Sequence, residues 1–307
     1  MNAIDRFDAA EDRVLRRYHL KAESRFIDVE TVEGAARVLV IGDGLLPVVM
    51  VPGFGDPGAL WAPLIEHMRE HRVYVVERPC FGRTGCATHR AETMRQLGVT
   101  FLEQVLDGLG LARVGFVANS IGSLWCLWLA LDRAERVACM SHVGCPATIL
   151  GTSAPLPMRL LSVPLVGRLL MALTPPSPKQ VRRFAAMAGV DLSDAAEIVD
   201  LLVALQQLPH VPRAMRDVVR ATVRLRGPRP GVQLGAGQLE RVTQPVQYIW
   251  GEDDPFGSVA TGEAAARLTH AEFQVIAGAG HLPWIKDARR VAQIASPFLR
   301  AHAQRAA

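Results

Sequence analysis

Apolar residues along the chain form two alternating patterns. A continuous apolar run at 47–51 and mostly apolar runs at 72–77, 114–118 and 136–143 are typical of strands that are buried on both faces of a sheet. The segments between them, at 60–71, 91–109 and 123–131, have the spacing or length of helices. Strands and helices that alternate in this way predict βαβ units and a mostly parallel sheet flanked by helices.

The same patterns predict elements near both ends of the chain. At the N-terminus, residues 3–20 predict an amphipathic helix, and residues 26–30 and 37–41 predict a hairpin that turns at Gly34. Towards the C-terminus, we expect strands at 246–250 and 272–276 and helices at 258–268 and 287–303.

The alternation is interrupted between residues 146 and 243. This segment has only helical patterns, which are separated by proline-rich joints. Because strands precede and follow it, we predict a helical lid that is inserted between two strands of one sheet. The predicted organisation is an α/β core made of residues 1–145 and 244–307, with the lid at 146–243.

Composition narrows the class of protein. Half of the 307 residues are hydrophobic and the net charge is only +4, and no basic run with interleaved aromatic residues occurs, so nucleic-acid binding is not expected. The five cysteines follow no C-x-x-C pattern, which suits a reducing cytoplasm. The N-terminal residues show no apolar signal core, and no apolar run has the length of an integral membrane span. The sequence does not specify the oligomeric state.

The stretch around Ser120 carries the first candidate for chemistry. A short apolar strand ends at Ala118, and a long apolar helix begins just after Ser120. A serine in such a turn lies at the N-terminus of the helix, where backbone N–H groups face whatever its hydroxyl attacks. The small residues Ala118 and Gly122 let the strand and the helix approach closely.

A carboxylate and a histidine follow two later strands. Asp253 and Asp254 come after the strand that ends at Trp250, and His281 comes after the strand that ends at Ile276. The carboxyl ends of parallel strands share one edge of the sheet, so these side chains can meet Ser120 there. A serine needs an imidazole to accept its proton, and the imidazole needs a carboxylate to fix its tautomer.

Five motifs in order now resemble those of the α/β-hydrolase fold family. They are Met50-Val-Pro-Gly-Phe-Gly, Glu77-Arg-Pro-Cys-Phe-Gly-Arg-Thr, Ala118-Asn-Ser-Ile-Gly, Trp250-Gly-Glu-Asp-Asp-Pro and Gly278-Ala-Gly-His-Leu-Pro-Trp. The order Ser, Asp, His also matches the family. The resemblance covers roughly 26–146 and 244–300, and the chain departs from it at Ala118 (usually Gly), Pro52 (usually His) and Cys80 (usually Gly).

The resemblance implies roles for individual residues. Ser120 is the expected nucleophile, His281 the base and Asp254 the acid, with Asp253 as the alternative acid. The backbone N–H groups of Phe54 and Ile121 are the expected oxyanion hole. No cofactor and no metal are implied.

Several alternatives remain open. His67-Met-Arg-Glu-His71 has the spacing of a zinc motif, but no third ligand is evident, so helix-edge histidines are the favoured interpretation. The favoured function is a hydrolase of carboxylic esters with an apolar or acyl small-molecule substrate. A thioesterase, a C–C bond hydrolase or a non-catalytic ligand-binding protein could share the same scaffold.

The apolar run from Leu156 to Leu173 leads to a prediction about the pocket. We expect Leu160, Leu161, Leu165 or Leu169 to line it, and arginines at its mouth could favour anionic substrates.

Overall fold

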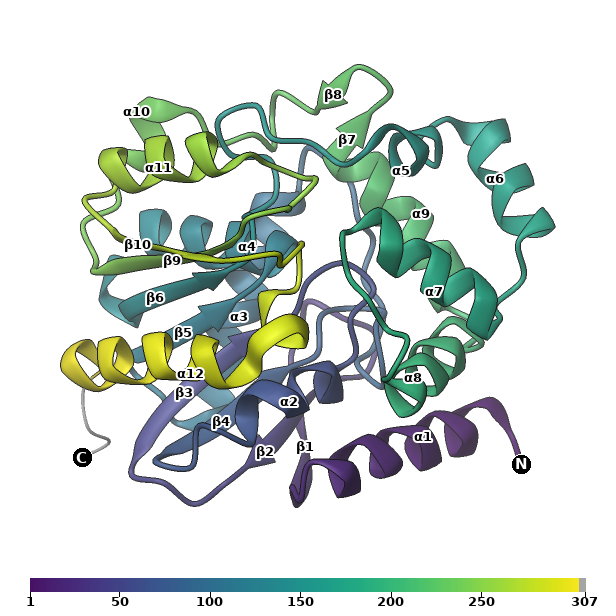
Figure 1. Cartoon of the computed structure of the whole chain (residues 1–307), viewed down its shortest axis with the longest axis horizontal. Helices are drawn as coiled ribbons and strands as arrows, with labels where there is room; N and C mark the ends of the chain where they lie inside the picture. The colour runs from purple at the N-terminus through teal and green to yellow at the C-terminus, as the bar shows by residue number, and fades with distance from the viewer. Residues whose placement is uncertain (304–307) are drawn as a thin grey trace.

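The computed structural model describes residues 1–303, and these residues build one large sheet with helices on both faces (Figure 1). In this range the large sheet has eight strands in the order β1-β2-β4-β3-β5-β6-β9-β10. Strand β2 runs antiparallel to both of its neighbours, and all the other pairs are parallel. The predicted mostly parallel α/β sheet is therefore confirmed.

The strands of the large sheet are β1 (Ala22–Asp28), β2 (Ala35–Ile41), β3 (Leu46–Val51), β4 (His71–Val76), β5 (Val114–Ala118), β6 (Val137–Val143), β9 (Val246–Gly251) and β10 (Glu272–Ile276). Strands β3, β5, β6 and β9 are buried along their whole length, as expected of strands with mostly apolar sequences. The predicted N-terminal hairpin is the antiparallel pair β1–β2.

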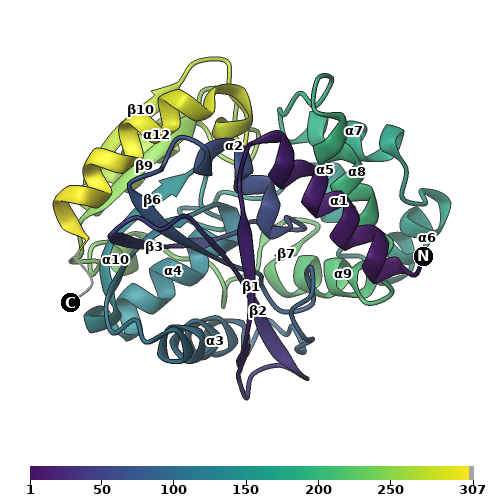
Figure 2. The ribbon, with the colours of Figure 1, turned by 90° about the horizontal axis from the view of Figure 1, so that it is seen from below.

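The core helices are α1 (Ala3–Arg17), α2 (Ala62–Ile65), α3 (Met94–Leu109), α4 (Ser120–Asp132), α11 (Val259–Leu268) and α12 (Pro283–His302). Helices α3 and α4 pack together on one face of the sheet, and α2 and α12 pack together on the other (Figure 2). No helix among residues 1–303 is both long enough and apolar enough to cross a membrane.

The prediction of one long helix at 60–71 is wrong. A short 3₁₀ helix, η1 (Gly58–Trp61), leads into the single-turn helix α2, and β4 already begins at His71. Trp61 stacks on Trp284 of α12 with ring centroids 4.0 Å apart, and both rings are fully buried. This packing, rather than helical periodicity, accounts for the apolar positions of the segment.

Between β6 and β9 the chain forms α5 (Leu156–Leu160), α6 (Pro164–Leu173), α7 (Pro178–Met187), α8 (Ala196–Gln206), α9 (Val211–Thr222) and α10 (Ala236–Leu239). The prediction that this segment contains only helices is wrong, because Val223–Arg224 (β7) and Gly227–Pro228 (β8) form a small hairpin. Helices α5 to α9 gather to one side of the sheet (Figure 1).

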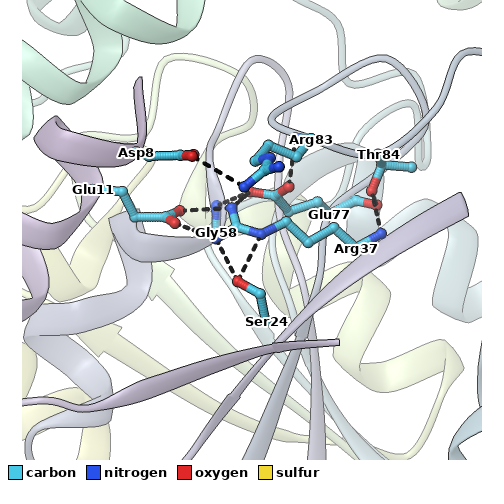
Figure 3. A network of polar contacts seen from close by, with 8 residues as sticks. All are labelled: Asp8, Glu11, Ser24, Arg37, Gly58, Glu77, Arg83 and Thr84. Carbon is cyan, nitrogen blue, oxygen red and sulfur yellow. Dashed lines mark hydrogen bonds and ion pairs between the residues drawn. The ribbon is translucent and has the colours of Figure 1, made fainter. Parts of the chain in front are cut away.

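A buried ionic network fastens α1 to the core (Figure 3). The guanidinium of Arg37 contacts both carboxylate oxygens of Glu11 on α1, and its Nη1 donates to Glu77 at 3.3 Å. The Glu77 carboxylate also accepts the N–H groups of Gly58 (3.4 Å) and Arg83 (2.9 Å). Burial raises the pKa of Glu11 to about 7, opposed by the Arg37 charge. The network therefore connects α1 to the loops that follow β3 and β4.

Candidate active site

Ser120 occupies a strained turn between β5 and α4. Its φ is +51°, a left-handed conformation that costs a non-glycine residue on the order of 1–3 kcal/mol. The turn is tight because α4 lies against the end of β3: a side chain at Gly122 would come within 2.2 Å of the Val51 carbonyl oxygen. Only glycine fits there, which explains the small residue two positions after the serine.

Asn119 connects three segments behind the serine. Its Nδ2 donates to the carbonyl of Val143 (2.7 Å) at the end of β6 and to the carbonyl of His281 (3.0 Å). The side chain is fully buried. Sequence reasoning assigned Asn119 no role, and its position directly before the serine was the only available signal.

Asp254 and His281 form a buried pair. Nδ1 of His281 lies 2.9 Å from Oδ2 and 3.1 Å from Oδ1 of Asp254. Asp254 also accepts the N–H groups of Cys145 (2.9 Å) and Phe256 (2.9 Å), so both of its oxygens are held in place. Asp253, the alternative acid, is exposed, and its backbone N–H donates to the Ala279 carbonyl.

The second nitrogen of His281 points at no protein partner. Within residues 1–303, Nε2 is buried and forms no hydrogen bond, so Ser120 and His281 are not hydrogen-bonded to each other. Both residues nevertheless line one cavity. Phe256 stacks on the imidazole, with ring centroids 3.9 Å apart, and was not identified from the sequence.

The loop that contains Phe54 packs against Ser120. A side chain at Gly53 would lie 2.3 Å from Oδ1 of Asn119 and 3.3 Å from Cβ of Ser120, so only glycine allows this approach. Buried Arg78 supports the loop: its Nε donates to the Pro52 carbonyl at 3.0 Å and its Nη2 donates to the Gly53 carbonyl. Burial lowers the pKa of Arg78 to about 10, which still leaves it charged near neutral pH.

Ile121 lies in the first turn of α4. The N–H groups of a first helical turn have no partner within their own helix. Phe54 and Ile121 both line cavity walls that include Ser120. Both residues therefore lie beside Ser120, and their predicted role as oxyanion hole stays a prediction.

The cavity that contains Ser120 and His281 is apolar and small, with a volume of about 90 Å³. Helices α7 and α8 contribute several walls, among them Val181, Phe184, Met187 and Leu202. Apart from His281, Asp56 is the one ionisable side chain that lines it among the described residues. Burial raises the pKa of Asp56 to about 6, and the Arg78 charge opposes this shift. Asp56 was not identified from the sequence.

The leucines predicted to line this cavity do not do so. Leu165 and Leu169 are 78% and 60% exposed, because α6 turns this face away from the sheet. Leu160 and Leu161 instead line an outer cavity of about 560 Å³, which shares Met158, Phe184, Met187, Gln206 and Met215 with the inner one. Arg168, Arg183 and Arg216 line this outer cavity and not the inner one.

The candidate zinc motif is not assembled. His71 is buried at the start of β4, with Nε2 3.7 Å from Glu70. Among residues 1–303, no group of three or more His, Cys, Asp or Glu side chains is arranged to hold a metal ion.

Comparison with known proteins agrees with this geometry. Residues 48–294 match the sequence pattern of the Alpha/beta hydrolase family, which is most of the chain. The chain belongs to the alpha/beta hydrolase family. The resemblance inferred from the five motifs is therefore confirmed.

Similar proteins include hydrolases of two kinds. A 2-hydroxy-6-oxononadienedioate/2-hydroxy-6-oxononatrienedioate hydrolase from Paraburkholderia phymatum is 26% identical, over 91% of this chain and 96% of that protein. A carboxylesterase from Bacillus subtilis superposes with a TM-score of 0.76 at 19% identity, covering 98% of this chain and 99% of its own. A 2-hydroxy-6-oxo-6-phenylhexa-2,4-dienoate hydrolase from a Rhodococcus species gives a TM-score of 0.73 at 20% identity, covering 92% and 99%.

Proposed function

We propose that this hydrolase cleaves carboxylic esters with Ser120 as the nucleophile, His281 as the base and Asp254 as the residue that positions the base. Nε2 of His281 accepts the Ser120 proton while Oγ attacks the ester carbonyl. Nδ1 stays bonded to Asp254, which stabilises the imidazolium that forms. The imidazolium then protonates the leaving alcohol, and water releases the acid from the acyl-enzyme by the same steps.

In this proposal the backbone N–H groups of Phe54 and Ile121 bind the developing oxyanion. Each such donor is worth roughly 2.7–4 kcal/mol in acyl-transfer chemistry. Arg78 has a positioning role, because its hydrogen bonds to the carbonyls of Pro52 and Gly53 hold the loop that presents Phe54. Residues 146–243 act as a lid whose helices α7 and α8 wall the cavity.

The charge of the inner cavity is the observation that favours an ester as the substrate. Ser120 and the Asp254–His281 pair open onto apolar walls whose one acidic side chain is Asp56. Among the described lining residues no Lys or Arg is available to pair with a substrate carboxylate. A buried carboxylate without a partner is costly, so a neutral acyl or alcohol group suits this cavity better than an anionic one.

A C–C bond hydrolase with the same residues is the second candidate, because the relative from Paraburkholderia phymatum is named for a dienedioate substrate. Two assays on the purified protein separate the candidates. Chromogenic esters from acetate to octanoate test ester cleavage, and loss of the absorbance of a 2-hydroxy-6-oxo-dienedioate tests C–C cleavage.

Ester turnover that is abolished in Ser120→Ala, together with labelling by a fluorophosphonate, supports the proposal. Faster turnover of the dienedioate than of every ester would contradict it. Saturable ligand binding without labelling would instead indicate a binding protein.

A further inference from the structure

The outer face of the inserted segment combines exposed leucines with a strong excess of positive charge. Five large apolar side chains protrude from α5, α6 and the β7–β8 turn: Leu156 (54% exposed), Leu165 (78%), Leu169 (60%), Leu173 (69%) and Leu225 (45%). Residues 165, 169 and 173 are spaced by four and therefore share one face of α6. Three exposed leucines on one helix face, with two more on neighbouring elements, indicate an interaction site.

The segments that carry or adjoin these leucines contain charges of almost one sign. Residues 155–183 contain five Lys or Arg and no Asp or Glu, and residues 210–231 contain six Arg and one acidic residue, Asp217. Asp217 itself lies 3.5 Å from Arg213. The net charge of the whole chain is only +4, so the positive charge is concentrated here.

Contacts between the elements keep the basic and apolar residues together. Arg220 of α9 donates to the Pro164 carbonyl at the start of α6 (3.0 Å), and Arg159 donates to the Leu225 carbonyl in the hairpin turn (3.1 Å). Arg224 and Arg226 are exposed on either side of Leu225. Helix α6 lies at the opposite end of the molecule from the C-terminal end of α12 (Figure 1).

Two acidic residues of the inserted segment face helix α1 instead. Glu197 and Asp200 of α8 contact Arg17 (3.0 Å) and Arg13 (3.6 Å) of α1, which packs beside α8 (Figure 2). Helix α1 therefore neutralises acidic groups of the segment, and the outer face keeps its positive charge.

We propose that this face, defined by α5, α6 and the β7–β8 turn, docks on the surface of an anionic lipid bilayer. Arginines attract anionic headgroups, while the protruding leucines insert into the boundary between headgroups and acyl chains. A bilayer suits highly exposed leucines, whereas a folded protein partner would require a complementary groove. Helices α5 and α6 of this face also line the outer cavity, which shares five side chains with the cavity of Ser120, so in this proposal the docked protein takes up its substrate from the bilayer side.

The experiment measures binding to vesicles of phosphatidylcholine alone and of phosphatidylcholine mixed with phosphatidylglycerol. It uses the wild type and Ser120→Ala, because docking needs no hydrolysis and its failure is then separate from any failure of the proposed function. We expect both proteins to bind the anionic vesicles, to ignore the neutral ones and to dissociate as salt is added.

Two double variants test the two components of the face. Arg224→Gln with Arg226→Gln should weaken binding by about 25-fold, since each arginine near an anionic surface contributes about fivefold. Leu165→Ser with Leu169→Ser should weaken it by at least about tenfold, because a seryl side chain gains nothing from the acyl boundary.

The matched controls are Leu45→Ser, which alters an 83% exposed leucine before β3, and Arg289→Gln with Arg290→Gln on α12. Both controls should bind like the wild type. Equal binding to both vesicle types, no binding to either, or equal losses in test and control variants would overturn the proposal. A dimer that the Leu165 and Leu169 changes dissociate, without vesicle binding, would assign the face to a second copy of the chain.

Discussion

The charge of Asp56 offers a direct test of how the inner cavity selects its substrate. Asp56→Asn keeps the size of the side chain and removes the one acidic charge among the described cavity walls that is not paired with His281. We expect the variant to accept esters whose acyl chain ends in a carboxylate, such as monoethyl glutarate, better than the wild type does. The neutral ester of equal length, ethyl pentanoate, should be affected little.

The size of the effect follows from the dimensions of the cavity. Two unit charges about 6 Å apart in a medium with an effective dielectric constant of about 20 repel by about 3 kcal/mol, so the effect is at most on the order of 100-fold in kcat/KM, since the nearby Arg78 charge opposes that of Asp56. Because burial raises the pKa of Asp56 to about 6, its carboxylate is ionised above that pH. The preference of the wild type for the neutral ester should therefore shrink as the pH falls through about 6, and Asp56→Asn should lack this dependence.

The same substitution should change stability in a pH-dependent way. The folded pKa of Asp56 (about 6) lies above its ordinary value of 3.8, so the folded state holds the proton more tightly than the unfolded state. The contribution of Asp56 to stability is then greatest below about pH 3.8 and is lost as the pH rises through about 6. A shift of about 2 pKa units corresponds to at most about 3 kcal/mol, which Asp56→Asn should recover at pH 8 and not at pH 4.

The assays measure kcat/KM for the two esters from pH 5 to 8 and the free energy of unfolding in urea at pH 4 and pH 8. Asp253→Asn is the control, since this neighbouring carboxylate of the acid loop is exposed. An ester ratio that changes by less than about twofold, with equal stability at pH 8, would refute the electrostatic reasoning.

Three further outcomes test the site and the core. Ser120→Ala should fold normally and lose about 10³- to 10⁶-fold in kcat, measured on the best ester, since the attacking atom is gone. Asp254→Asn should lower kcat by up to about 10⁴-fold and Asp253→Asn far less; the reverse order would move the acid by one residue. Arg37→Met should lower the free energy of unfolding by about 3–5 kcal/mol in urea titrations, because it leaves Glu77 buried without its charge partner.

The parts of the fold that were predicted correctly have patterns that act locally. Strands such as β3 and β5 are buried on both faces, so their sequences are continuously apolar and need no knowledge of their neighbours. The 60–71 segment was misjudged because the burial of Trp61 depends on Trp284, more than two hundred residues later. The hairpin β7–β8 was missed because each strand has only two residues, too few to show a period.

The site shows the same division between local and distant causes. The tight turn at Ser120 could be anticipated from Ala118 and Gly122, because the spacing of small residues is a local requirement. Asp56 and Phe256 could not, since each owes its place to the packing of the inserted helices or the histidine loop around it. The prediction that the α6 leucines line the cavity failed for the same reason, because an apolar run shows which residues could be buried but not which neighbour covers them.

We propose that two charge features of the molecule, the Asp56 carboxylate in the apolar inner cavity and the basic outer face, act on different parts of one substrate. In the proposed arrangement, Arg224, Arg226 and their neighbours bind anionic headgroups at the surface, where water and salt reduce the cost of pairing. Asp56 then excludes the same negative charge from the small inner cavity, where no Lys or Arg lines the walls among the described residues. In this proposal an uncharged ester portion moves from the outer cavity to the inner one, which share Met158 and Phe184, while a charged headgroup stays outside. The combination predicts hydrolysis of neutral esters that are dissolved in or attached to anionic membranes, and it predicts that Asp56→Asn changes which molecules reach Ser120 without changing how strongly the protein binds vesicles.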